Sequence, residues 1–341
     1  MSSRSVGEDE HAGFDRPRRH TRPRTKDRPD YSDAPVGMVV TVDRGRFRTL
    51  LEGREVTATK ARQLGRTGVI VGDRVRLAGD ASGEEGTLAR IVEVLERETV
   101  LRRTADDDDP YERPIVANAD QLVIVTALAD PPPRTGMIDR ILVAGFDAGI
   151  EPLLCLTKAD LAPPDDLAAL YTPLGVPVVA VSPGSDLGEV RAALAGHRSV
   201  FVGHSGVGKS TLVNALIPGA KRMVGVVNDV TGRGRHTSTS AIALELPDLP
   251  FAGGPGGVVP PGGSRGWVID TPGVRSFGLS HVTRESLVRA FADLAALTED
   301  CPRGCTHETS APECALDAAV LRGELTHARL ESFRRMLDFR Q

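Results

Sequence analysis

The sequence predicts an α/β protein in which a parallel central sheet follows a small β-barrel and precedes a helical segment with a cysteine-rich site. Three observations predict this fold. Short β-rich runs broken by Gly and Asp fill residues 36–103, apolar runs alternate with helical segments over residues 104–280, and three cysteines and a histidine crowd together within residues 281–341. Strands buried on both faces form near-continuous apolar runs, so their alternation with helices indicates a parallel sheet.

Composition narrows the class of protein. The chain has 341 residues, 40% of them hydrophobic, which is enough for two or three domains with a sizeable core. No run of about 18 apolar residues occurs, and the N-terminus lacks the apolar centre of a secretory signal. Four cysteines are too few for a disulfide scaffold. We therefore expect a soluble cytoplasmic protein with no membrane partner.

Residues 1–35 are expected to form a disordered basic arm. Residues 16–28 carry seven Arg or Lys against one Asp and are rich in Pro. Such a segment buries too little apolar surface to offset the entropy lost on ordering. Whether the arm only aids solubility or also contacts RNA is left open by the sequence.

Residues 36–103 are expected to form a small closed barrel of the oligonucleotide-binding kind. Five short β-rich runs occur here without a helix-period stretch, at residues 37–43, 46–53, 54–60, 73–79 and 87–95. The pattern alone does not separate this barrel from other small β-domains. Phe47 is the one aromatic residue of the segment, so base stacking is not the expected mode of binding.

The expected central sheet follows an acidic run at residues 105–110, which we interpret as a solvated connection. A helix is expected around Ile138 to Ala148, and a Gly/Pro-rich insertion at residues 247–266 is expected to be a surface loop without chemistry. The apolar strand candidates are residues 121–128, 151–158, 175–182, 198–203, 241–246 and 266–273.

One motif indicates binding of a nucleoside triphosphate. Gly203, Gly208, Lys209 and Ser210 fit the pattern G-x-x-x-x-G-K-S between an apolar strand and a helix. Backbone amides of such a loop face the phosphates, the Lys reaches the β and γ groups, and the Ser hydroxyl binds Mg²⁺. We assign nucleotide contacts to Gly203, His204, Ser205, Gly206, Val207, Gly208, Lys209, Ser210 and Thr211.

A second motif, Asp-Thr-Pro-Gly, begins at Asp270 at the end of an apolar strand. Alone it is an ordinary turn. Beside a phosphate loop it becomes a candidate second switch, in which Asp270 holds Mg²⁺ through water and the amide of Gly273 senses the γ-phosphate.

A third motif indicates which base is recognised. Thr157, Lys158, Ala159 and Asp160 follow an apolar strand, where a solvated loop is the alternative interpretation. The carboxylate of Asp160 can accept hydrogen bonds from N1–H and the 2-amino group of guanine, and the alkyl stem of Lys158 can lie along the base. Adenine would leave the carboxylate unpaired, so GTP is favoured, and an ATPase or kinase is disfavoured.

The three motifs occur in an unusual order, with base recognition before the phosphate loop and the second switch last. Neighbours in a sheet need not be neighbours in sequence, and domains whose termini lie close together tolerate permutation. The sequence therefore predicts a circularly permuted P-loop GTPase core.

With the β-barrel before it and the Cys/His cluster after it, this order resembles the ribosome small-subunit-dependent GTPase family, RsgA or YjeQ. The resemblance covers roughly residues 36–340. It implies a permuted GTPase between an OB-fold and a zinc-binding helical domain, with GTP and GDP as nucleotides. It also implies that the protein binds the small (30S) ribosomal subunit and its rRNA and assists late maturation of that subunit.

The cysteine-rich segment is expected to bind one structural zinc ion. Cys301, Cys305, His307 and Cys314 form a Cys₃His set of soft ligands, which suits tetrahedral Zn²⁺ with all four positions filled by protein. The spacing differs from the family pattern by one residue in two places. Three ordinary reduced thiols are the alternative.

Hydrolysis is expected to be slow in the free protein. Val274 follows the second-switch Gly, where a Ras-like enzyme has a water-orienting Gln. The resemblance implies that His236 positions the water and that Thr237 or Thr239 closes on Mg²⁺, with Lys209 at the phosphates. A solvated or RNA-contacting role for His236 stays open.

The sequence leaves two candidate functions open. In the first, the subunit stimulates GTP hydrolysis by a monomeric enzyme, and hydrolysis drives release. In the second, the protein is an RNA-binding assembly factor for which GTP is mainly a regulatory ligand.

Overall fold

The structure is a computed structural model, and it describes residues 30–65, 67–104, 111–220, 241–247, 266–272, 277–280 and 282–337. Residues from Ala34 onward form one compact unit. Several predictions fall outside the described residues: the basic arm up to residue 29, the acidic run, the central part of the Gly/Pro-rich insertion, and the switch residues His236, Thr237, Thr239, Gly273 and Val274.

Five strands of the N-terminal segment close into a barrel. Their order is β1-β2-β3-β5-β4, and β4 pairs back to β1. Residues of alternating strand positions fill the interior, among them Val39, Phe47, Val56, Val75 and Ile91. The predicted OB-like barrel is therefore confirmed. The strands are β1 (Val36–Asp43), β2 (Arg46–Leu51), β3 (Arg54–Lys60), β4 (Arg74–Gly79) and β5 (Ala89–Val94), with a short 3₁₀ helix η1 (Arg62–Leu64) after β3.

A two-stranded antiparallel sheet, which the sequence pattern does not predict, follows the barrel. β6 (Val100–Arg103) pairs with β7 (Arg113–Ala117). The pair joins residues on both sides of the boundary expected between residues 103 and 104, and Val71 of the barrel segment forms a bridge with Val116. That boundary, like the other domain limits, stays a prediction.

The predicted parallel sheet is present, with strand order β10-β9-β8-β11-β13-β12. All neighbours are parallel except β12, which is antiparallel to β13. A single pairing of Thr41 with Ile242 connects β12 to the barrel strand β1. The strands are β8 (Gln121–Ala127), β9 (Glu151–Thr157), β10 (Val178–Val181), β11 (Arg198–Val202), β12 (Ile242–Glu245) and β13 (Trp267–Asp270).

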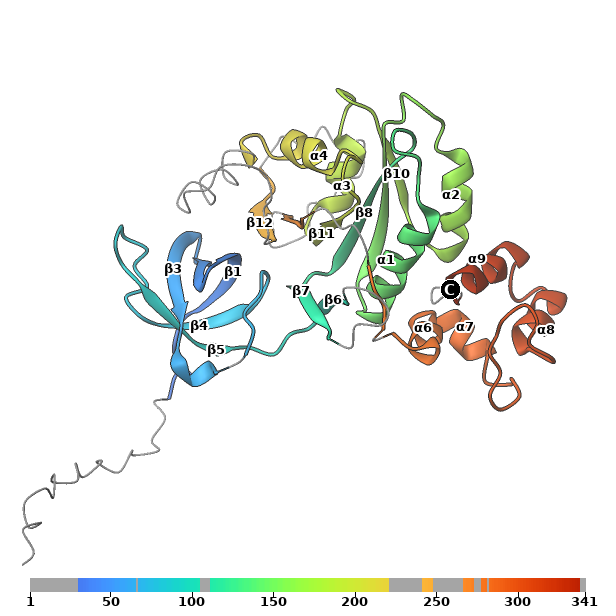
Figure 1. Cartoon of the computed structure of the whole chain (residues 1–341), viewed down its shortest axis with the longest axis horizontal. Coiled ribbons are helices and arrows are strands. Elements are labelled where there is room, and N and C mark those ends of the chain that lie inside the picture. The colour runs from blue at the N-terminus through green and yellow to red at the C-terminus, as the bar shows by residue number, and fades with distance from the viewer. Residues whose placement is uncertain are drawn as a thin grey trace, which may run out of the picture. The chain divides into compact units, whose positions relative to one another are not determined.

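Helices cover both faces of this sheet (Figure 1). Alternate strand residues pack against these helices. Ile124 and Leu154 pack in the cluster that holds Ile141 of α1, whereas Val123 packs with Leu212 of α4 on the opposite face. Burial on both faces explains why the strands are uninterrupted apolar runs. The helices are α1 (Thr135–Asp147), α2 (Asp165–Tyr171), the 3₁₀ helix η2 (Thr172–Leu174), α3 (Gly188–Leu194) and α4 (Lys209–Leu216).

The C-terminal segment is helical and shares a hydrophobic core with α1. Phe291 contacts Phe146 of α1 at 4.4 Å and Phe333 at 5.5 Å between ring centroids. Thr283 begins the first helix with a capping box, because its side chain accepts from the Ser286 amide and the Thr283 amide donates to the Ser286 hydroxyl. The helices are α6 (Arg284–Ala290), α7 (Ala292–Leu297), α8 (Ala315–Arg322) and α9 (His327–Leu337).

Among the helices of the described ranges, none combines the length and the apolar character needed to span a bilayer.

Candidate functional site

The phosphate loop lies at the carboxyl end of the parallel sheet, between β11 and α4, where open α/β sheets bind their ligands. Two of its glycines are required by geometry. A Cβ on Gly203 would lie 2.4 Å from the carbonyl oxygen of Val125 in β8, and Gly208 has φ +89° at the first position before α4. The loop therefore packs tightly on the sheet before it turns into α4.

A direct hydrogen bond joins the segment expected to recognise guanine to the phosphate loop. The buried hydroxyl of Thr157 lies 2.5 Å from the carbonyl oxygen of Val207, to which it donates. The next residue, Lys158, has φ +58° and donates from its ammonium group to the carbonyl of Asp130. Asp160 is exposed beside this junction. The structure thus brings the two motifs together, while the base contact itself stays a prediction.

The second-switch carboxylate lies against the phosphate-loop lysine. Lys209 is buried, with 7% of its surface exposed, and its ammonium group pairs with the Asp270 carboxylate and donates to the carbonyl of Thr271. Thr271 in turn donates to the carbonyl of Phe201, 2.7 Å away, which ties the end of β13 to β11. A cation, a carboxylate and the exposed hydroxyl of Ser210 therefore gather at one end of the sheet.

One residue near the loop was missed by the sequence analysis. Arg134 precedes α1, and its Nη1 lies 3.2 Å from Nε2 of His204. A guanidinium only donates, so Nε2 accepts, and Nδ1–H of His204 donates to the carbonyl of Ser205 at 2.8 Å. The contact between Arg134 and His204 braces the phosphate loop against the start of α1. No local sequence pattern signals a contact between residues 70 positions apart.

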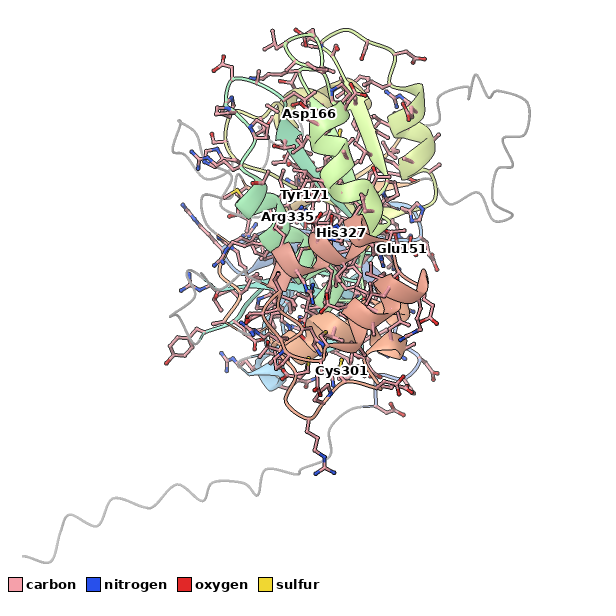
Figure 2. The ribbon with its side chains drawn as sticks, turned by 90° about the vertical axis from the view of Figure 1, so that its right-hand side faces the viewer. Glu151, Asp166, Tyr171, Cys301, His327 and Arg335 are labelled. Carbon is pink, nitrogen blue, oxygen red and sulfur yellow. The ribbon has the colours of Figure 1, made fainter. Side chains whose placement is uncertain are left out.

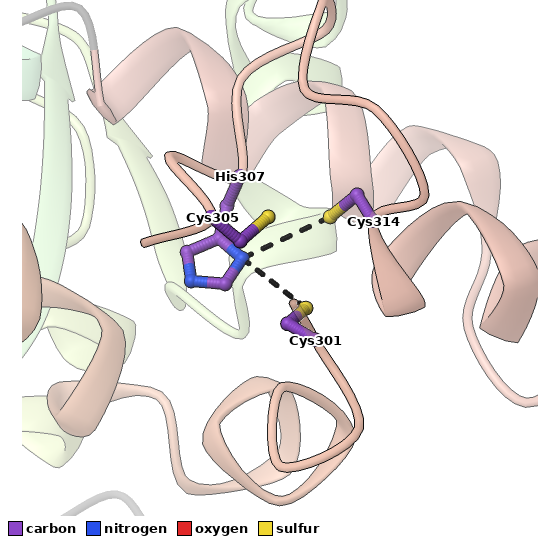
Figure 3. Close-up of side chains that lie close together, drawn as sticks. All are labelled: Cys301, Cys305, His307 and Cys314. Carbon is purple, nitrogen blue, oxygen red and sulfur yellow. Dashed lines mark hydrogen bonds between the residues drawn. The ribbon is translucent and has the colours of Figure 1, made fainter. Parts of the chain in front are cut away.

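The four side chains of the cysteine cluster lie close enough together to hold one metal ion (Figure 3). The ligand atoms of Cys301, Cys305, His307 and Cys314 all lie within 4.8 Å of one another. Nδ1 of His307 is 3.6 Å from the sulfur of Cys301 and 3.8 Å from that of Cys314. Tetrahedral zinc, with bonds of about 2.0 Å to nitrogen and 2.3 Å to sulfur, would separate a nitrogen and a sulfur ligand by about 3.5 Å.

The electrostatics of the cluster also fit a cation. Burial first, and then the neighbouring Cys314 and Cys305 sulfurs, raise the pKa of the Cys301 thiol to about 11. Burial, followed by the charge of Arg334, lowers the pKa of His307, which keeps its imidazole neutral and able to ligate. A divalent cation bound by all four groups would stabilise the three thiolates together.

Replacing Cys305 by Ser is expected to abolish stoichiometric zinc binding and to loosen α8 and α9. Three remaining ligands leave the site open, and the free energy of zinc binding contributes directly to the folding of small metal modules. Elemental analysis should find about one zinc in the original chain, and hydrogen exchange should report the helices. Thr306→Ser, an exposed neighbour, is the control. If metal-free protein melts like the original, the cluster does not bind structural zinc.

Comparisons with known proteins agree with these features. Residues 94–280 match the RsgA GTPase family. The chain is 41% identical over 279 residues to the small ribosomal subunit biogenesis GTPase RsgA of Azotobacter vinelandii, with 79% of this chain and 74% of the relative covered. The chain belongs to the RsgA GTPase family. The RsgA of Pseudomonas aeruginosa strain LESB58 is 43% identical over 234 residues, which cover 66% of this chain and 64% of that relative's length.

Two solved structures have a fold similar to most of this RsgA-family chain. YjeQ from Thermotoga maritima aligns with TM-score 0.63 and 27% identity, covering 89% of this chain and 97% of that one. YloQ, described as a circularly permuted GTPase, aligns with TM-score 0.61 over 91% of this chain at 24% identity, which supports the fold alone. The predicted family, the permuted core and the OB-like barrel are confirmed, and the C-terminal helices carry a Cys₃His cluster compatible with zinc.

Proposed function

We propose that this protein hydrolyses GTP to GDP and phosphate. The observation that carries the proposal is the direct hydrogen bond from Thr157 to the Val207 carbonyl, because it fixes the guanine-recognition segment against the phosphate loop. One bound nucleotide can then contact Asp160 with its base and Lys209 with its phosphates. Membership of the RsgA GTPase family supports the same activity.

In this proposal, different residues of the site bind the base, the phosphates and the metal ion. Asp160 accepts hydrogen bonds from guanine, and the phosphate-loop amides and Lys209 hold the phosphates. Ser210 and Asp270 offer the oxygen ligands that Mg²⁺ prefers, and the metal would neutralise charge on the phosphates. The attacking water is oriented by His236, and Thr237 or Thr239 closes the first switch. The roles of His236, Thr237, Thr239 and Gly273 rest on the family resemblance and the motif order.

We further propose that the small ribosomal subunit and its rRNA are the partners of a monomeric, cytoplasmic protein. The support is that curated relatives about 40% identical are named small ribosomal subunit biogenesis GTPases. In this proposal, the subunit holds the first switch in the arrangement that catalysis requires.

GTP turnover is expected to rise at least tenfold when mature small subunits are added, which is about 1.4 kcal/mol of barrier. The physical reason is that the side chain of Val274 cannot hydrogen-bond to the attacking water. Binding of the small subunit is expected to orient that water instead. Phosphate release at saturating GTP measures the effect, and large subunits are the control. Equal turnover with and without small subunits would remove the subunit from the proposal.

A further inference from the structure

Arg334 in α9 connects the loop of the cysteine cluster to α8. Its Nε donates to the carbonyl oxygen of His307 at 3.0 Å, and its two Nη atoms lie 2.8 and 2.7 Å from the two carboxylate oxygens of Asp317 in α8. The side chain of Arg334 is only 12% exposed. One planar guanidinium therefore fastens a ligand's backbone and a neighbouring helix at the same time.

The hydrogen bond from Arg334 reaches a residue of the ligand loop that has an unusual backbone conformation. His307 has φ +58°, a left-handed backbone that a non-glycine residue adopts at some cost. The hydrogen bond from Arg334 to the His307 carbonyl holds this conformation, which directs Nδ1 toward the sulfurs of Cys301 and Cys314. Charge favours the same arrangement, because three thiolates and one Zn²⁺ carry a net negative charge that a nearby cation offsets.

The next residue along α9 faces the central domain. Arg335 donates to the carboxylate of Asp139 in α1 at 3.2 Å and to the carbonyl of Leu170 at 3.1 Å, and its guanidinium lies 5.1 Å from the ring centroid of Tyr171 (Figure 2). Ser332 donates to the same Leu170 carbonyl. α9 therefore contacts the metal cluster with one side and the helices of the sheet with another.

We propose that Arg334 is a positioning residue that couples metal binding at the Cys₃His cluster to the seating of α9 on α1 and α2. Zinc fixes the ligand loop, the loop carbonyl and Asp317 fix Arg334, and Arg334 fixes α9 so that Arg335 reaches Asp139. Outer contacts of this kind commonly change metal affinity 10- to 100-fold.

The test measures zinc affinity of the full chain by competition with a chromophoric chelator. Arg334→Gln is expected to bind zinc at least tenfold more weakly, and Arg334→Lys is expected to recover only part of the loss, because Lys keeps the charge without the fork. Arg322→Gln is the matched control, since Arg322 pairs with Glu324 in the same module without contacting a ligand. Affinity of Arg334→Gln within twofold of this control would overturn the proposal.

A second measurement distinguishes coupling from a merely weakened module. Hydrogen exchange is followed in protein saturated with zinc, at concentrations that fill the site in every variant. In the original chain, zinc is expected to protect the amides of α9 and of α1 around Asp139, and in Arg334→Gln this protection is expected to be lost although zinc is bound. Unchanged protection in the zinc-loaded variant would overturn the coupling.

A third variant keeps the proposal testable if Arg334→Gln folds poorly. Asp317→Asn removes the carboxylate that orients Arg334 but leaves every ligand in place. It is expected to weaken zinc binding in the same direction by a smaller factor. In the double variant the two losses should not add, because both act through one guanidinium. Fully additive losses would show that Asp317 and Arg334 act separately, contrary to the proposal.

Discussion

Replacing Asp160 by Asn is expected to weaken GTP binding about a hundredfold and to create binding of xanthosine triphosphate. In the proposed base contact, the carboxylate accepts from N1–H and the 2-amino group of guanine, and hydrogen bonds to a charged group contribute about 1.5–3 kcal/mol each. Xanthine has an oxygen in place of the amino group, to which the Asn amide can donate. Dissociation constants for both nucleotides, measured with fluorescent analogues, check the exchange.

The structure makes this substitution a clean test of base recognition. Asp160 is exposed, while the segment before it is fixed by the Thr157 hydroxyl, by the Lys158 ammonium and by the Ala159 amide, which donates to the carbonyl of Val181 at 3.1 Å. The variant therefore changes the chemistry of the side chain and leaves the backbone in place. Asp166→Asn, at an exposed position in the first turn of α2, is the control. A retained preference for GTP in Asp160→Asn would contradict the base assignment.

The fold could be predicted wherever burial imposes a local pattern. Strands such as β8, all of whose residues are buried, must be apolar on both faces and were found from that run alone. β6 and β7 were missed because they are short, and Arg102, Arg113 and Pro114 are exposed in them. Main-chain hydrogen bonds hold these two strands together across the acidic connection. Such a pair produces little pattern in the side chains from which strands are predicted.

The site was predictable to the extent that its residues are adjacent in sequence. The phosphate loop and the four metal ligands are local motifs, whose spacing follows from the reach of a turn. The contacts that brace them are different: Arg134 with His204, Asp130 with Lys158, and Arg334 with His307. Each joins segments that only the folded topology brings together, so no spacing rule predicts them.

These bracing contacts hold the proposed nucleotide-binding groups in place without a partner. The base segment, the phosphate loop and the end of β13 are already joined by hydrogen bonds from Thr157 and Thr271, so the binding half of the site is preorganised. Preorganised binding groups stabilise bound nucleotide without by themselves lowering the barrier to hydrolysis. In the proposed mechanism, turnover depends on the group that orients the attacking water, and His236 is the residue proposed for that role.

Replacing His236 by Ala is expected to remove the stimulation of GTP turnover by small subunits while leaving GTP affinity and subunit binding within about twofold of the original. The side chain is assigned to the water, so its loss should affect the transition state more than the bound substrate. Single-turnover hydrolysis and co-sedimentation with small subunits measure the two properties separately. Release should slow in parallel, because the protein stays in its GTP-bound form on the subunit.

The matched control for this variant is His327→Ala. His327 is an exposed histidine at the start of α9, 3.4 Å from Glu331, and it has no part in the proposed chemistry. It should keep both the stimulated rate and the binding. If His236→Ala retains the stimulated rate, another group orients the water. If it loses the rate but dissociates from the subunit as fast as the original protein, hydrolysis does not drive release, and GTP acts mainly as a regulatory ligand of an RNA-binding assembly factor.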